Sequence, residues 1–341
     1  MNTRHRRVLW LVFLLMIGGL CLPRTAHATA SCTITTISNV QFGHVNLSSG
    51  TVSVSGTINW SCTSAGILGI LLAPEADIAM CLNLNAGTGG TQLNPRQLSN
   101  GSSSLQYQLY TNAGYTTIWS STATSTPLMI QVSIPGTLLF SNTKTGTASF
   151  YAQLPAGQTS ATTGAYTSTL IASVTGSYTD SGNKPIATCT GGTTALNTGS
   201  ASFTVSATVD KDCLVTASTI DLGAVPSTAT NITSSGTLGV TCSNGTPYYV
   251  GLAPSGGSST GAGTMKGTLT GNTDLVPYQL SSTPGPGGTP WGNTATSTSV
   301  GNGVAGTGSG LSQPKTVYAT APNANFRPDS YSDTVTVNVN Y

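Results

Sequence analysis

Apolar and polar residues alternate with a period of two in many short segments of this chain. One run near the middle has its apolar members at Phe203, Val205, Ala207 and Val209. The last run of the chain has them at Val335, Val337, Val339 and Tyr341. This period is typical of a strand with one buried face, and no long stretch has the period of a helix. Gly, Ser and Asn separate the runs, so we expect an all-β protein of short strands.

The first 28 residues have a different pattern, that of an export signal. Met1–Arg7 is basic, Val8–Leu22 is apolar, and Ala26–Ala28 has the small residues of a cleavage site. The apolar run is shorter than the roughly 20 residues that a spanning helix needs. We therefore expect a signal peptide over 1–28, and a mature protein that is secreted through the periplasm to the cell surface.

Charge is scarce, and its balance excludes one class of partner. The sequence has 11 basic and 9 acidic residues, and only 6% of its residues are charged. Removing the four arginines of the signal leaves the mature chain slightly acidic. A basic face for nucleic acid or anionic lipid is not expected.

The two halves of the chain repeat one another. Cys32 and Cys62 match Cys213 and Cys242 at nearly equal spacing. Further matches are Tyr107–Leu109 with Tyr278–Leu280, Trp119 with Trp291, Tyr166 with Tyr331, and Leu72–Pro74 with Leu252–Pro254. On this alignment Ile67–Leu72 corresponds to Pro247–Leu252 and is expected to be core in both copies. We expect two tandem immunoglobulin-like β-sandwiches, over 29–209 and 210–341.

Six cysteines remain after the signal, an even number in an oxidising compartment. Repeat symmetry pairs Cys32 with Cys62 and Cys213 with Cys242, and elimination pairs Cys81 with Cys189. The spacing lacks the close cysteine pairs of a metal site, so we expect three disulfides and no metal or other cofactor.

These residues resemble the spore coat protein U domain family, whose members are subunits of archaic chaperone–usher pili. Both halves contain the motifs of this family in the same order along the chain. Its motifs are Val40–Gly43, Pro95-Arg96, Leu105–Tyr110, Trp119, Ala156–Gln158 and Tyr331–Val335, with Ile220–Gly223 and Trp291-Gly292 in the second half. Ser120 follows Trp119 where the family pattern has Gly, and the second half lacks a clean Gly-Gln before its last strand.

The resemblance implies an incomplete sandwich that a neighbouring subunit completes by donating a strand. It also implies a periplasmic chaperone, an outer-membrane usher and an adjacent pilin as partners. Main-chain hydrogen bonds give such an added strand its affinity, and its alternate side chains fill the open core. The edge expected to accept the strand is the run Val335, Val337, Val339 and Tyr341.

A donor segment would need roughly eight to ten residues at about 3.3 Å each. Only Thr29–Ser31 would precede Cys32 after cleavage, and Tyr341 ends the sequence. The expectation is a subunit that accepts a strand and donates none, at the tip of a filament. The run Phe203, Val205, Ala207 and Val209 stands where a donor would precede the second half's first cysteine. It is expected to serve instead as the last strand of the first domain, although an ordinary linker is the alternative.

A tip subunit would attach to an abiotic or host surface and support biofilm formation. Two segments that the second half lacks on this alignment, roughly 75–97 and 179–199, carry the candidate adhesive residues Ile78, Met80, Leu82 and Ile186, and Leu138, Leu139 and Phe140 are added to this patch. For Ile78–Leu82 the alternative is a plain core strand. A non-adhesive pilus or spore-coat-like subunit is an alternative function, and a secreted carbohydrate-binding module is another.

No enzyme is expected. His44 is the mature chain's one histidine, and a solvated turn is its expected place. The close pair Glu75 and Asp77 could suggest glycosidase carboxylates, but a surface turn is expected there too.

Overall fold

The computed structural model describes residues 29–341 except 66–74, 125, 136–140, 181–185 and 198. The first domain has strands β1 (Thr29–Ile37), β2 (Val40–Val45), β3 (Val52–Ala65), β4 (Ala76–Leu84), β5 (Arg96–Ser99), β6 (Ser104–Tyr110), β7 (Leu128–Ile134), β8 (Asn142–Leu154), β9 (Gly164–Thr179), β10 (Thr194–Ala195) and β11 (Gly199–Val209). One 3₁₀ turn, η1 (Thr122–Thr124), lies between β6 and β7. In the described part of the chain, no helix is both long and apolar enough to cross a membrane.

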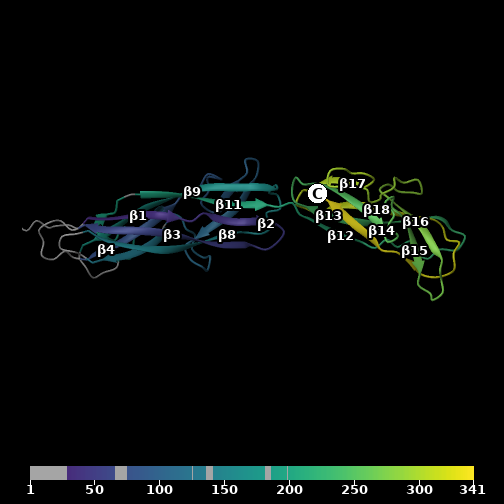
Figure 1. The fold of residues 1–341 in the computed structure, drawn as a ribbon, viewed down its shortest axis with the longest axis horizontal. Coiled ribbons are helices and arrows are strands. Elements are labelled where there is room, and N and C mark those ends of the chain that lie inside the picture. The colour runs from purple at the N-terminus through teal and green to yellow at the C-terminus, as the bar shows by residue number, and fades with distance from the viewer. Residues whose placement is uncertain (1–28, 66–74, 125, 136–140, 181–185, 198) are drawn as a thin grey trace, which may run out of the picture.

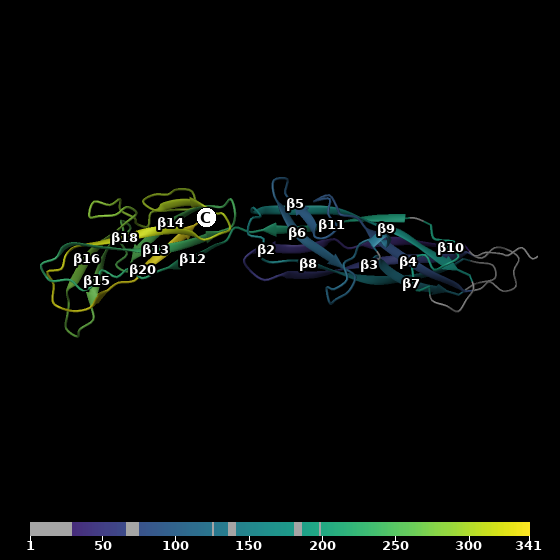
Figure 2. The same cartoon turned by 180° about the vertical axis from the view of Figure 1, so that it is seen from behind.

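The second domain repeats this architecture with fewer strands. It contains β12 (Cys213–Ala217), β13 (Thr230–Cys242), β14 (Pro247–Pro254), β15 (Ala262–Gly267), β16 (Leu275–Ser281), β17 (Val304–Thr307), β18 (Gln313–Asn323), β19 (Tyr331–Ser332) and β20 (Val335–Asn340). Figures 1 and 2 show the two domains end to end along the long axis of the molecule. The prediction of an all-β chain with two immunoglobulin-like sandwiches is confirmed.

The first domain is built from two layers of strands. One layer has the order β1-β3-β8-β6-β5, and the other has β7-β4-β9-β11-β2. A single residue pair, Ser99 with Thr167, joins β5 to β9. Trp119, Tyr107 and Phe150 are fully buried in the core cluster that both layers share. All pairs are antiparallel except that of β11 with β2.

A buried cation fixes one side of this core. Arg96 is fully buried and donates hydrogen bonds to the carbonyl oxygens of Asn85 (3.0 Å) and Trp119 (2.9 Å) and to Oε1 of Gln108 (2.7 Å). Burial lowers its pKa to about 10. These bonds connect the first residue of β5 to the segment after β4, to β6 and to the main chain at Trp119.

The second domain has the strand orders β12-β13-β18-β16-β15-β19 and β17-β14-β20. Trp119 and Trp291, which are matching residues of the two halves, establish how the domains correspond. Trp119 donates its indole N–H to the carbonyl of Leu82 in β4 (2.7 Å), and Trp291 donates to that of Val250 in β14 (2.8 Å). β4 is therefore the counterpart of β14.

This correspondence corrects the sequence alignment, which matched Ile67–Leu72 with Pro247–Leu252. The counterpart of β14 is β4, and 66–74 lies outside the described residues. The segment Ile78–Leu82 is thus not unique to the first domain. Its hydrogen-bonded neighbours are β7 on one side and β9 on the other, as expected for a strand inside a sheet.

The candidate adhesive patch is wrong for its four described residues. Ile78, Met80 and Leu82 are at most 1% exposed, and Ile186 is 5% exposed. The nearly continuous apolar run in β4 arises because the strand is buried on both faces. Leu138, Leu139 and Phe140 lie outside the described residues.

The pair Glu75 and Asp77 also differs from expectation. Asp77 is buried within β4 rather than in a surface turn, and it accepts a hydrogen bond from the hydroxyl of Ser133 on β7 (2.5 Å). The carboxylate is therefore part of the packing between two strands.

The three disulfides have the predicted pairing. Cys32–Cys62 and Cys213–Cys242 occupy the same place in the two domains, where each joins the first strand to its neighbour. Cys81–Cys189 ties β4 to the segment that precedes β10 and closes a loop of sequence separation 108. Such a loop restricts the unfolded chain, which stabilises the domain by about 4–5 kcal/mol on the chain-entropy model.

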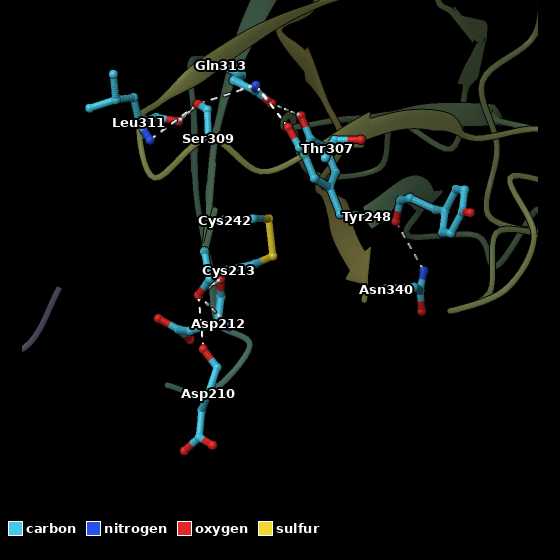
Figure 3. Close-up of a disulfide and its surroundings, with 12 residues drawn as sticks. Asp210, Asp212, Cys213, Cys242, Tyr248, Thr307, Ser309, Leu311, Gln313 and Asn340 are labelled. Atoms are coloured by element: carbon cyan, nitrogen blue, oxygen red, sulfur yellow. Dashed lines mark hydrogen bonds between the residues drawn. A yellow bond between two sulfur atoms is a disulfide. The ribbon is translucent and has the colours of Figure 1, made fainter. Parts of the chain in front are cut away.

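Only three residues, 210–212, connect β11 to β12, and contacts on both sides hold the domains together. Asn46 donates to the carboxylate of Asp212 (2.7 Å), and Asn244 donates to the carbonyl of Ser160 (2.6 Å). His44 is at the exposed end of β2, where Nδ1 lies 2.7 Å from the carboxylate of Asp210. Figure 3 shows Asp210 and Asp212 beside the Cys213–Cys242 disulfide.

Candidate strand-acceptor groove

The strand β11 completes the first domain. It is antiparallel to β9 along its whole length and parallel to β2 on its other side. Its apolar residues Phe203, Val205, Ala207 and Val209 are all buried. Phe203 stacks on Trp119 with ring centroids 6.2 Å apart and packs against Phe150 at 5.6 Å.

In the described residues of the second domain, no strand has the place of β11. The counterpart of β9 is the interrupted pair β19 and β20, and β20 pairs only with β14. The counterpart of β2 is the segment that contains Ile220–Gly223, which matches Val40–Gly43 and forms no strand. The second domain therefore has counterparts of β9 and β2, the two neighbours of β11, but no strand of its described residues lies between them.

An open groove follows from this arrangement. It has a volume of about 490 Å³, and its apolar lining includes Ile220, Leu222, Leu252, Val317 and Val335. Val335, Val337 and Val339 are only half-buried, although their counterparts Leu170, Ala172 and Val174 in β9 are fully buried. The three valines are more exposed because no strand covers them, whereas their counterparts in the first domain lie against β11.

Of the predicted acceptor residues, Val335 lines this groove, and Val337 and Val339 continue from it along β20. Val335, Val337 and Val339 of β20 alternate toward the core of the second domain. Tyr341 follows the strand and is 41% exposed, and Asn340 donates a hydrogen bond to the carbonyl of Tyr249 in β14 (3.4 Å) (Figure 3). Asn340 therefore lies beside the first residues of β14, at the end of the second domain that faces the first (Figure 1).

A polar cluster interrupts the apolar lining. Asp333 lies between β19 and β20, where it accepts hydrogen bonds from the hydroxyls of Tyr278 (2.5 Å) and Ser255. Partial desolvation raises the pKa of Asp333, but these hydrogen bonds outweigh it, and the pKa lies below its usual range. Burial, the same hydrogen bond and the negative charge of Asp333 raise the pKa of Tyr278. Asp333 is therefore a carboxylate, and Tyr278 a neutral phenol, at neutral pH.

Sequence reasoning missed two parts of this groove. The first is the wall made by Ile220 and Leu222, although the motif Ile220–Gly223 was a visible signal because it matches Val40–Gly43. The second is Asp333, whose place in the lining depends on how the strand crosses from one sheet to the other. A sequence pattern gives no direct sign of that crossing.

No cluster of three or more possible metal ligands occurs among the described residues. The groove offers main-chain hydrogen-bonding groups along β20 and apolar pockets beneath them. This combination suits an extended peptide.

The family model of the Spore Coat Protein U domain matches residues 20–173 and again 199–338. The chain belongs to the Spore Coat Protein U domain family. The two matches cover most of the two sandwiches, and the second also takes in β11.

Two solved structures illustrate what this Spore Coat Protein U domain chain is similar to. The complex of CsuC with the tip adhesion subunit CsuE, from archaic Csu pili of Acinetobacter baumannii, is 17% identical, covers 91% of this chain and 100% of the other, and has a TM-score of 0.48. The CupB6 tip adhesin from Pseudomonas aeruginosa is 9% identical, covers 92% and 94%, and has a TM-score of 0.33. No curated protein matches the chain in sequence.

Proposed function

We propose that this protein is the tip adhesin of an archaic chaperone–usher pilus. Its C-terminal domain accepts a strand from a periplasmic chaperone, and then, at the outer-membrane usher, from the adjacent pilin. Its N-terminal domain attaches to an abiotic or host surface and supports biofilm formation. The observation that carries the proposal is the groove of the second domain, which lies where β11 completes the first.

The direction of the missing strand supports a terminal position for the first domain. A strand that copies β11 would be antiparallel to β20 and parallel to the segment with Ile220 and Leu222. Figure 1 shows the C-terminus at the end of the second domain that faces the first, and β15 and β16 at the opposite end. The donated strand would therefore run away from the first domain, and its own subunit would follow beyond β15 and β16.

The same template indicates what the donor must look like. Phe203 faces Leu170 in the register of β11 with β9, and the counterpart of Leu170 is Val335. In the first domain Phe150 packs against Phe203, and the counterpart of Phe150 in the second domain is the smaller Val317, which leaves more room for the donor's side chain. The donor is expected to carry a large apolar residue opposite Val335.

A peptide test follows directly. We expect a synthetic peptide with the sequence of Gly199–Val209 to bind the purified full chain and to raise the melting temperature of the second domain. Ligand at 100 times its dissociation constant stabilises a folded state by about 2.7 kcal/mol. Calorimetry with increasing peptide measures the shift. A control peptide with Phe203→Asp and Val205→Asp should have no effect, and equal shifts from both peptides would contradict a specific groove.

Attachment requires a separate test. We expect that replacing Leu138, Leu139 and Phe140 with serine lowers the number of bacteria attached to polystyrene about tenfold, the effect of losing roughly 1.4 kcal/mol of binding free energy. The matched control replaces Leu214 and Leu311, exposed leucines of the second domain, with serine. Pili counted by electron microscopy should be unchanged in both strains. Unchanged attachment in the first strain would favour a non-adhesive structural subunit.

A further inference from the structure

The polar cluster around Asp333 has a counterpart in the completed domain. Tyr166 and Tyr331 are matching residues, and two positions after them come Ser168 and Asp333. Ser168 is fully buried, and its hydroxyl accepts a hydrogen bond from the backbone N–H of Gly89 (3.0 Å). The first domain therefore has a small neutral hydroxyl where the second has a carboxylate.

The register of β11 shows which donor residue meets this position. Val205 lies directly opposite Ser168, and both side chains are fully buried in the core. Directly opposed residues in antiparallel strands have Cβ atoms about 4.5–5.5 Å apart. A strand bound in the second domain would bring its corresponding residue equally close to Asp333.

A covered groove would leave Asp333 without water. The carboxylate accepts hydrogen bonds from the hydroxyls of Tyr278 and Ser255, from the backbone N–H of Ser255, and from the backbone N–H of Thr334, which is 2.8 Å away. A bound strand would remove the water on the groove side of this charged group, and removing water from a carboxylate is costly unless polar partners replace it. An aliphatic residue such as valine supplies no such partner, whereas a side chain that donates a hydrogen bond does.

We propose that Asp333 selects the strand that the groove accepts, by requiring a hydrogen-bond donor such as threonine, serine or lysine in the place that Val205 has in β11. This inference rests on the proposed function, because it concerns the partner of the same groove. The built-in strand of the first domain, which faces Ser168, is free of this requirement and carries valine.

The test compares two peptides on the full chain. One has the sequence of Gly199–Val209, and the other has the same sequence with Val205→Thr, a change that adds a hydroxyl at nearly constant volume. We expect the threonine peptide to bind the wild-type chain about tenfold more tightly, as one added hydrogen bond to a charged group allows. Fluorescence anisotropy of labelled peptides measures both dissociation constants.

Two variants locate the preference. Asp333→Ser copies the first domain and should abolish or reverse the preference for threonine. Asp221→Ser removes another carboxylate of the groove lining, one that is exposed and accepts from its own loop at Gly223, and should leave the preference intact. The comparison on the wild-type chain stands even if the Asp333 variant fails to fold.

The outcomes separate this inference from the proposed function. Equal affinity of the two peptides for the wild-type chain overturns the role of Asp333 and leaves the groove as a strand acceptor. A preference that persists in Asp333→Ser also overturns it. Binding of neither peptide contradicts the proposed function itself, and the inference fails with it.

Discussion

Replacing Met80 with aspartate is expected to unfold the first domain at temperatures where the wild-type domain is stable. Met80 is fully buried in β4, between β7 and β9, so the new carboxylate would have neither water nor a cation beside it. Burying an uncompensated charge in a core costs roughly 5 kcal/mol or more, a large part of the stability of a domain. Calorimetry of the full chain should show the lower-melting transition in the first domain only.

The neighbouring strand offers a matched control for this substitution. Met129 lies on β7 and is 40% exposed, so Met129→Asp should change stability by no more than about 0.5 kcal/mol. Should Met80→Asp not accumulate, the milder Met80→Ala is expected to cost about 2–5 kcal/mol. Unchanged melting of both Met80 variants would return this residue to the candidate surface patch.

The second large effect concerns the built-in strand. Phe203→Ala is expected to lower the free energy of unfolding of the first domain by about 3–5 kcal/mol. The phenyl ring fills the space against Trp119 and Phe150, and its removal leaves a cavity that these large rings cannot close. Denaturant titration of the full chain, followed by tryptophan fluorescence, measures the loss.

Two controls distinguish a structural strand from a linker. Ser202→Ala changes an exposed neighbour on the opposite face of β11 and should be neutral within about 0.5 kcal/mol. Val335→Ala changes the counterpart of Leu170, the residue that Phe203 faces in the first domain. It should cost less than about 1 kcal/mol of stability, because it is half-buried beside an open groove. If Phe203→Ala is as mild as Ser202→Ala, β11 does not complete the first domain.

Much of the fold could be predicted because strand alternation and the repeat are local signals. The run ending at Val209 is a strand, the last run is a strand up to Asn340, and the cysteine pairing follows from the repeat and from elimination. The inward-facing residues of β20, Val335, Val337 and Val339, follow from the same signal, since the period of two identifies which side chains face the core.

The failures came from aligning the two halves on a short match of sequence letters. Leu72–Pro74 and Leu252–Pro254 share their letters, but the indole bonds to Leu82 and Val250 show that β4 corresponds to β14. A run such as Ile78–Leu82 is apolar at every position, and an exposed patch and a strand buried on both faces produce the same pattern.

Spacing along the chain is enough to establish the all-β class, the two related halves, the disulfide pairs and the inward-facing residues of β11 and β20. Spacing does not show which strands have neighbours on both sides, because that depends on how distant segments pack together. Met80 is buried because β4 lies between β7 and β9, and Val335 is half-exposed because β20 has a neighbour on one side only. The tertiary packing also brings Asp333 into the lining of the groove opposite Ile220, although more than a hundred residues separate the two in the chain. Burial depends on which segments pack together in space, and local alternation carries no record of that packing.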